Sequence, residues 1–406
     1  MTQDVVIVGA GIAGVSIAEH LLRSQPGLKV LLADQHHVGA GSTSRSLAAF
    51  RHQWSVPAHV AFSKYSAADY ERLIGLGYGL EFRRNGYLFL YTDRTRWQHA
   101  ILRAERQRDL GVEVETMTAV DSTRIPCASA VQDDAVIGAT WGPNDGFLDP
   151  LAVAQAYLDE ARHRGLEYRT GWMPTALHGS DRVTGISFGA ERIDTTRVIL
   201  AAGIWSASIA EAWGLSLPLI AAKRYIYHSR PLKDVDVSRW PLVIGDRGQH
   251  CRPSEGNTLM LSWEHRPQAR ATLPDAAALW DEQDAIEPGF GASEYGIDVL
   301  AELSRHLPVL AESVSIRNAT SGWYANTLDD KAILGPDPRR PGLYLATGFS
   351  GHGIMHGGAT GRVMSELLLE LPPSLISFDE LEREFGIEPL RAGTPRLPVE
   401  EMSLIS

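Results

Sequence analysis

The sequence predicts an α/β (α+β) protein of two interleaved lobes, one built on a parallel β-α-β unit and the other on an antiparallel sheet. Three observations lead to this prediction. The length of 406 residues exceeds the size at which a single core stops growing. Residues 4–34 alternate buried-strand and helix patterns. Residues 216–265 are rich in Tyr, Trp and Val in alternating patterns, as in an antiparallel sheet.

The β-α-β unit opens the chain. An apolar run ending at Val8 predicts a strand buried on both faces, and Val30–Leu32 predicts a second one. Between them, apolar residues recur at helical spacing up to Leu22. A glycine-rich turn joins the first strand to this helix, and an acidic residue, Asp34, closes the second strand.

That turn has the pattern of a Rossmann dinucleotide site, Gly9-x-Gly11-x-x-Gly14. The first glycine permits the tight turn, Gly11 lets backbone N–H groups approach a pyrophosphate, and Gly14 allows close packing of helix on strand. Asp34 follows about 20 residues later, where an acidic side chain accepts hydrogen bonds from ribose hydroxyls. Its charge also argues against a cofactor that carries a 2′-phosphate.

The remaining elements follow from local patterns. The tail after Pro372 contains further prolines and is expected to be a surface extension. Helices are predicted at 57–74, about 94–111, about 151–164 and within 274–307, and strands at 87–91, 166–169, 174–178, 183–188 and 198–203.

Composition and charge exclude several classes of function. Thirty-eight Lys and Arg against 49 Asp and Glu leave a formal net charge of −11, so a nucleic-acid partner is not expected. Cys127 and Cys251, the two cysteines, have no metal-ligand spacing, so neither a metal nor a disulfide framework is expected and the reducing cytoplasm is the predicted location. The apolar stretch 5–15 is too short to cross a bilayer, so no membrane insertion is expected.

A dense set of donors suited to an anion follows the second strand, at Ser42, Thr43, Ser44, Arg45 and Ser46. This segment resembles the corresponding one in the FAD-dependent D-amino acid oxidase superfamily, in particular its sarcosine oxidase, dimethylglycine dehydrogenase and proline dehydrogenase β-subunit branch. Later segments extend the resemblance over nearly the whole chain; they are 145–150, 198–206, 322–336 and the Gly-Phe-Ser-Gly-His-Gly run within 348–362.

The resemblance implies a Rossmann-like FAD-binding lobe interleaved with an antiparallel-sheet substrate lobe. The FAD-binding lobe would comprise 1–82, 141–215 and 323–372, the substrate lobe 83–140 and 216–322, and the C-terminal extension 373–406. The residues it implies for FAD are Gly9, Gly11, Ile12, Ala13, Gly14, Asp34, Gln35, Ser42, Thr43, Ser44, Arg45, Ser46, Pro174, Ala202, Gly203, Trp205, Gly351, His352, Gly353, Ile354 and Met355.

The mode of FAD attachment can also be predicted. Relatives attach the flavin covalently through a cysteine or a histidine at two positions, which here hold Gly322 and Arg45. Because neither residue is a nucleophile of that kind, FAD is expected to be non-covalent. A helix starting near Ile354 would aim N–H groups at the N1–C2=O edge of the flavin, which becomes anionic on reduction.

The candidate catalytic residues come from the same resemblance. Arg51 matches an arginine that holds a substrate carboxylate, with a salt-bridged structural role as the alternative. Met355 takes the place of a second cationic anchor, a lysine. Glu264 is expected either to pair with a substrate ammonium or to be a surface residue beside Arg266, and His352 either to act at the flavin or to be a packed histidine. The full set is Arg51, His52, Glu264, Tyr324, His352 and Met355.

The oxygen-activating lysine of the oxidases in this branch aligns with Met260, which favours a dehydrogenase, or an oxidase that uses Lys223, Lys331 or another group. The leading hypothesis is FAD-dependent oxidation of a C–N bond in an amino acid or secondary or N-alkylated amine, by hydride transfer to flavin N5 and hydrolysis of the imine. The alternatives are oxidation of a C–O bond in a 2-hydroxy acid or polyol and a non-catalytic or obligate-subunit flavoprotein. A homo-oligomer and a partner dehydrogenase subunit both remain open.

Overall fold

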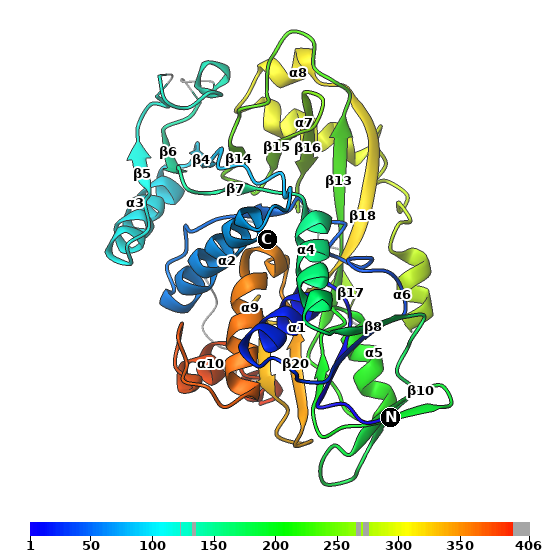
Figure 1. Cartoon of the computed structure of the whole chain (residues 1–406). Helices are drawn as coiled ribbons and strands as arrows, with labels where there is room; N and C mark the ends of the chain where they lie inside the picture. The colour runs from blue at the N-terminus through cyan, green and yellow to red at the C-terminus, as the bar shows by residue number, and fades with distance from the viewer. Residues whose placement is uncertain (122, 132–134, 265–268, 271–275, 393–406) are drawn as a thin grey trace.

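The computed structural model describes residues 1–121, 123–131, 135–264, 269–270 and 276–392. Two large sheets define two lobes, and segments of both lobes alternate along the chain (Figure 1). The predicted fold class, with parallel and antiparallel sheets in one chain, is therefore confirmed. No helix within the described ranges combines the length and the apolar character that crossing a membrane demands.

The first lobe is built on a six-stranded sheet in the order β19-β20-β12-β1-β2-β8, with every neighbouring pair parallel except β19 and β20. In chain order its strands are β1 (Val5–Val8), β2 (Val30–Asp34), β8 (Glu167–Thr170), β12 (Val198–Leu200), β19 (Ile333–Pro336) and β20 (Leu343–Thr347). Alternate residues of β1 point to opposite faces, so Val5 and Ile7 enter one core and Val6 and Val8 another.

Helices cover one face of this sheet, where α9 packs against both α1 and α2, and α1 against α4 (Figure 1). They are α1 (Ile12–Ser24), α2 (Pro57–Gly75), α4 (Pro150–His163) and α9 (Gly353–Leu368). The opposite face packs against α5 (Trp205–Ala212) and a three-stranded sheet of β9 (Ala176–His178), β10 (Gly185–Phe188) and β11 (Glu191–Asp194). The result is the doubly covered sheet that a Rossmann-like lobe requires.

The second lobe is built on a nine-stranded sheet in the order β17-β13-β16-β15-β14-β4-β6-β5, with β18 also paired to β13. Its pairs are antiparallel except for β4 and β14, which run parallel. Its strands are β4 (Tyr87–Tyr91), β5 (Glu115–Met117), β6 (Gly138–Gly142), β13 (Ile220–Ser229), β14 (Leu242–Gly245), β15 (His250–Ser254), β16 (Thr258–Ser262), β17 (Ala269–Arg270) and β18 (Ile316–Asn326). The predicted lobe boundaries at 141 and 323 fall inside β6 and β18, because both strands stay in this sheet over their whole length.

Further helices pack around this sheet. α3 (Arg94–Asp109) lies against β4, β5 and β6, while α7 (Tyr295–Ser304) contacts β16, β18 and α8 (Val309–Ser313). The prediction of helix over 274–307 holds only for α7 and for α6 (Ala276–Glu282), because Pro288, Gly289 and Gly291 interrupt the region between them. Residues 274 and 275 lie outside the described ranges.

The C-terminal segment corrects the prediction of a surface extension. Within 373–392 it forms α10 (Phe378–Phe385) and α11 (Glu388–Arg391). The ring of Phe385 is fully buried and stacks on Phe62 of α2 at a centroid distance of 4.8 Å. Arg391 anchors the end of the segment to Asp337 at 2.6 Å. Pro373 lies between α9 and α10 and Pro389 lies in the first turn of α11, so neither proline prevents packing. Residues 393–406 lie outside the described ranges.

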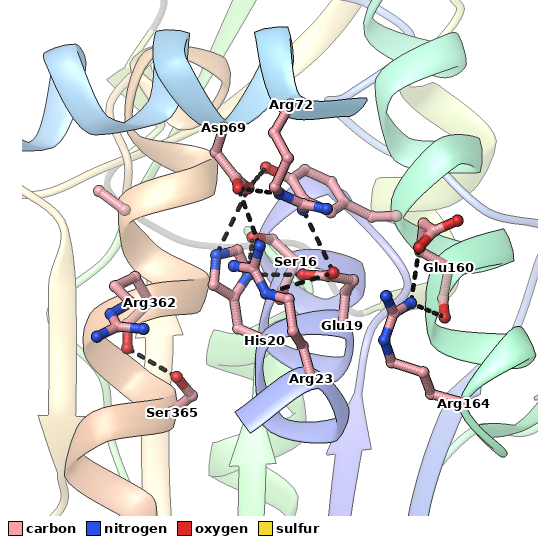
Figure 2. A network of polar contacts seen from close by, with 12 residues as sticks. Ser16, Glu19, His20, Arg23, Asp69, Arg72, Glu160, Arg164, Arg362 and Ser365 are labelled. Carbon is pink, nitrogen blue, oxygen red and sulfur yellow. Dashed lines mark hydrogen bonds and ion pairs between the residues drawn. The ribbon is translucent and has the colours of Figure 1, made fainter. Parts of the chain in front are cut away.

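A buried polar network joins α1 to α2 and α4 (Figure 2). Glu19, His20 and Asp69 place one donor atom each within 4.8 Å of the others, a spacing that would suit a metal. However, Glu19 lies 3.6 Å from Arg23, and Asp69 lies 2.6 Å from Arg72. Although burial raises the pKa of Asp69, His20 and Arg72 more than offset this and hold it below its usual value. We interpret the cluster as an ion-pair network that holds these helices together, because the guanidinium groups of Arg23 and Arg72 already pair with its carboxylates.

Candidate active site

A deep cleft opens at the carboxyl ends of β1, β2, β12 and β20, the edge where doubly wound sheets bind nucleotides. Each of these strands is followed there by a turn that the sequence singled out. The predicted FAD-binding residues that line the cleft are Gly9, Gly11, Ile12, Ala13, Asp34, Gln35, Ser42, Thr43, Ser46, Pro174, Ala202, Gly203, Trp205, Gly351, Gly353 and Ile354.

The three glycines of the first turn have different structural roles. Gly9 has φ of +106°, a conformation that favours glycine. A Cβ built on Gly14 would lie 1.9 Å from the carbonyl oxygen of Gly9, so Gly14 permits the close packing of α1 on β1 without itself lining the cleft. A Cβ on Gly11 would meet only Thr43 Oγ1, at 3.4 Å, and would otherwise project into open space at the cleft.

Two helix N-termini face the cleft. α1 begins after Gly11 and α9 after His352, and neither of these N-cap residues makes a side-chain capping hydrogen bond. The first N–H of α1, on Ile12, donates to Thr43 Oγ1 at 3.1 Å, and Gly353 and Ile354 of α9 form part of the lining. Both ends carry partial positive charge, so the cleft is suited to an anionic group at two points.

Asp34 lies where a ribose would be bound. Its Oδ2 accepts the N–H of Ala10 and its Oδ1 that of His36, each at 2.7 Å. Burial raises the pKa of this carboxyl, while the two backbone donors act in the opposite direction. Two fixed donors therefore hold the carboxylate in the cleft lining, and its remaining lone pairs can accept ribose hydroxyls. The cleft thus fits a dinucleotide such as FAD.

A second cavity, which we call the inner cavity, is continuous with the cleft because Ser46, Tyr324, Ser350 and Gly351 line both. Of the predicted catalytic residues, Glu264, Tyr324, His352 and Met355 line it. Its other polar side chains include Arg224, His250, Asn326 and Asp330, and its apolar wall includes Leu47, Leu242 and Ile244.

Charged groups of the inner cavity are paired and buried. Arg224 Nε lies 2.9 Å from Glu264 Oε1, and its guanidinium lies 5.3 Å from the centre of the Tyr324 ring. Burial raises the pKa of Glu264 although Arg224 lowers it, and burial also raises the pKa of Asp330. For His250 and His352 burial lowers the pKa, so both are neutral at neutral pH. The side chain of Glu264 is only 11% exposed, which is not the surface position considered beside Arg266; Arg266 itself lies outside the described ranges.

Arg51 and His52 lie outside the lining of both cavities. Arg51 is 1% exposed, and its guanidinium stacks on the Trp54 ring at 4.1 Å. His52 donates its backbone N–H to Asp145 Oδ1, and its Nδ1 lies 2.9 Å from the same oxygen. These two predicted catalytic residues are therefore not among the residues that line the inner cavity with Glu264 and Tyr324, although the charge of Arg51 contributes, after burial, to lowering the pKa of His352, which does line it.

Four predicted FAD-binding residues besides Gly14 also lie outside the cleft lining. His352 and Met355 line the inner cavity instead, and Ser44 donates to the carbonyl of Gly41. Arg45 forms an ion pair with Asp284 at 2.7 Å and also bonds the carbonyl of Ala40. It thus ties the donor segment to the chain that follows α6.

The positions that concern flavin attachment and oxygen activation can be located as well. A Cβ on Gly322 would lie 2.6 Å from Arg45 Cβ, so the two attachment positions adjoin each other and neither offers a nucleophile. Lys331 pairs with Glu384 at 2.8 Å, and Lys223 lies over the Trp323 ring at 5.1 Å. Neither lysine lines the cleft or the inner cavity as the described residues define them. Met260 faces Arg252 and His228 across neighbouring strands, also outside both linings.

Sequence reasoning missed several lining residues. Arg224 and His250 lie inside alternating strands, where no motif marks them. Asp330 belongs to a motif that the sequence singled out, and its φ of +57° marks an unusual backbone position that only the structure reveals. Trp280 of α6 stacks on His36 at a centroid distance of 3.3 Å, and both line the cleft close to Asp34.

The structure combines a nucleotide cleft on a parallel sheet with a polar cavity beside an antiparallel sheet. This combination is typical of two-lobed, dinucleotide-dependent oxidoreductases. The chain belongs to the FAD dependent oxidoreductase family, whose model matches residues 4–367. It is therefore an FAD-dependent oxidoreductase, as the sequence predicted.

Two relatives show the range of this family. The chain is 27% identical over 417 residues to FAD-dependent oxidoreductase domain-containing protein 1 of Bos taurus, covering 91% of this chain and 81% of the relative. It is 25% identical over 392 residues to mitochondrial dimethylglycine dehydrogenase of Homo sapiens, covering 93% of this chain but 44% of that longer protein.

Solved structures share the fold. L-proline dehydrogenase from P. horikoshii superposes with a TM-score of 0.84 at 23% identity, covering 97% of this chain and 99% of that one. Glycine oxidase from Geobacillus kaustophilus superposes with a TM-score of 0.78 at 20% identity, covering 95% and 98%. At these identities the likeness concerns the fold, which agrees with the two-lobe architecture described above.

Proposed function

We propose that the protein oxidises a C–N bond of an amino acid or of a secondary or N-alkylated amine, with hydrolysis of the resulting imine. The observation that carries this proposal is the inner cavity. It holds a guanidinium, on Arg224, and carboxylates, on Glu264 and Asp330, and it opens onto the FAD cleft at Tyr324 and Gly351. A small molecule that carries both an amine and a carboxylate complements such a set of groups.

When bound, FAD supplies the hydride acceptor. The chain contributes binding, orientation and exclusion of water. The N-terminus of α9 presents uncapped N–H groups at Gly353 and Ile354, and these favour negative charge in the cleft. Leu242, Ile244 and Met355 give the inner cavity an apolar wall, which strengthens the interactions of its charged groups with a substrate.

The proposed chemistry is supported by the names of similar proteins, which include a proline dehydrogenase, a glycine oxidase and a dimethylglycine dehydrogenase. The competing reaction, oxidation of a C–O bond, fits the cavity less well. Glu264 and Asp330 would repel a polyol phosphate or a second carboxylate, and a 2-hydroxy acid would leave both without a cationic substrate group.

An anaerobic screen of the purified, FAD-loaded protein tests the proposal. The absorbance of oxidised FAD is followed on addition of amino acids, N-methyl amines, cyclic imino acids, 2-hydroxy acids and polyol phosphates. We expect loss of that absorbance with members of the first three groups. Acyclic substrates should also release ammonia or a free amine, whereas a cyclic imino acid should give a ring-opened carbonyl product that keeps its nitrogen. Reduction by hydroxy acids alone would favour C–O oxidation, and reduction by none of the groups would favour the non-catalytic or obligate-subunit alternative.

A further inference from the structure

We propose that Arg224 and Glu264 together anchor the substrate, and that a zwitterionic amino acid binds by exchanging with their ion pair. Its carboxylate would take Glu264's place at the guanidinium of Arg224, and its ammonium would take Arg224's place at Glu264. This inference rests on the proposed function and deepens it, because it assigns the charged contacts of the substrate to residues other than Arg51.

The two residues meet where the inner cavity joins the cleft. Arg224 belongs to β13, and Glu264 follows β16, the strand paired with β13. Their side chains are 15% and 11% exposed, with 2.9 Å between Arg224 Nε and Glu264 Oε1. The guanidinium lies over the ring of Tyr324, which lines both the cavity and the cleft. A ligand held by this pair therefore lies at the entrance to the FAD cleft.

Charge selects Arg224 as the carboxylate anchor. Of the lining residues that the structure describes, Arg224 is the one with a fixed positive charge. His250 and His352 also line the cavity, but burial lowers the pKa of each. Arg51 stacks on Trp54 outside the lining. A substrate carboxylate inside the cavity has therefore one cation to bind, and that cation already prefers a carboxylate partner.

The carboxylates of Glu264 and Asp330 favour a cationic group at the other end of the substrate. Burial raises the pKa of both Glu264 and Asp330, so their charged forms lack part of the stabilisation that water would give. A substrate ammonium restores it. Asn326 Oδ1, which is buried without a hydrogen-bond partner among the described residues, offers an additional acceptor in the same cavity. Because Asp330 remains when Arg224 and Glu264 are engaged, we expect amino acids with neutral or basic side chains and exclusion of acidic ones.

The exchange has a signature that a merely structural ion pair lacks. Removing one member of the pair frees the other member for an external ion of opposite charge. Glu264→Gln should thus strengthen the binding of an anion and weaken that of a cation, and Arg224→Gln should do the reverse. A pair that only holds the fold would, when broken, weaken both kinds of ligand together.

The exchange is tested by the affinities of three compounds with a five-membered ring: cyclopentanecarboxylate, pyrrolidine and proline. Each is titrated calorimetrically into the FAD-loaded protein and its variants at neutral pH. We expect Arg224→Gln to weaken cyclopentanecarboxylate by about 10- to 100-fold, as for loss of a charged hydrogen bond, and to strengthen pyrrolidine. We expect the opposite for Glu264→Gln, weaker proline binding in both variants, and partial retention of carboxylate binding in Arg224→Lys. Arg84→Gln is the matched control, because it breaks an exposed ion pair with Glu71 away from the cavity.

Several results would overturn the inference. One is parallel weakening of both single-charge probes by each variant, with circular dichroism showing an intact fold. Another is loss of carboxylate binding in Arg51→Gln but not in Arg224→Gln, which would return the anchor to Arg51. Absence of binding by all three probes to the unaltered protein would also overturn it. The proposed oxidation is judged separately by flavin reduction, so crossed probe affinities without any reducing amine would sustain this inference and reject the proposed function.

Discussion

Replacing Gly11 or Gly14 of the nucleotide turn by alanine should affect different properties of the protein. Gly14 faces the backbone of the preceding turn, whereas Gly11 faces the cleft. We therefore expect Gly14→Ala to destabilise the fold, and Gly11→Ala to leave the fold nearly intact while most of the bound FAD is lost. Gly11→Val should remove FAD more completely, for the same reason.

The contact distances give the size of each effect. At Gly14 the added Cβ would lie 1.9 Å from the carbonyl oxygen of Gly9 and 3.1 Å from its carbonyl carbon, so backbone must move. Overpacking of this kind costs about 1–3 kcal/mol or more. At Gly11 the nearest atom, Thr43 Oγ1, would be at an ordinary contact distance of 3.4 Å. Gly11 precedes α1 as its N-cap, where alanine costs roughly 1 kcal/mol or less relative to glycine.

Two measurements separate the effects. Denaturant unfolding of the FAD-free proteins gives the loss in free energy of unfolding, and absorbance of the purified proteins gives the FAD content per chain. We expect a large stability loss only in Gly14→Ala. If Gly11→Ala kept full FAD content, or if it destabilised the FAD-free protein as much as Gly14→Ala, the assignment of Gly11 to the cofactor cradle would be wrong.

Three further outcomes are expected. Acid precipitation should release all FAD into the supernatant, because Gly322 and Arg45 occupy the attachment positions; yellow colour that stays in the pellet would contradict this. His356 is buried, and burial first and then Arg51 lower its pKa to about 3. Because the unfolded chain binds the proton first, the free energy of unfolding should fall as the pH drops below about 6.5, by up to roughly 1.4 kcal/mol per pH unit. His356→Phe should reduce the slope of unfolding free energy against pH between 7 and 5 by this contribution, leaving that of the other buried histidines, and an unchanged slope would refute that assignment. Substrate-reduced protein should be reoxidised slowly by air and faster by a quinone, because Arg224 is neutralised by Glu264 and neither Lys223 nor Lys331 lines the cavity; stopped-flow reoxidation by oxygen with stoichiometric peroxide would show the opposite.

The parts of the site that the sequence could predict are those made by local geometry. The turn from Gly9 to Gly14 and the strand ending at Asp34 bind through backbone that a short motif determines, and the structure places Gly9, Gly11 and Asp34 around one cleft. The Gly-Phe-Ser-Gly-His-Gly run at 348–353 could be predicted for the same reason, because a turn followed by the start of a helix is determined by nearby residues.

The inner cavity depends on which strands become neighbours, and that information is not local. Arg224 faces the cavity because β13 pairs with β16 and β18, a pairing that alternation along a single strand does not determine. Arg51 was expected at the substrate because of its place in a motif, but stacking on Trp54 keeps it outside the lining. For the C-terminal segment, the prolines suggested an exposed chain, whereas Phe385 finds a buried partner in Phe62, far away in the sequence.

The most direct test of the central claim is a single-turnover experiment on the FAD-loaded protein without oxygen. An acyclic reducing amine found in the screen is mixed in less than stoichiometric amount, and reduced FAD, released ammonia or amine, and the carbonyl product are quantified after quenching. For C–N oxidation we expect one equivalent of each per equivalent of substrate consumed. FAD reduction without release of nitrogen, or with nitrogen still bound to the carbon product after imine hydrolysis is complete, would contradict the assignment of this chain as an amine-oxidising enzyme.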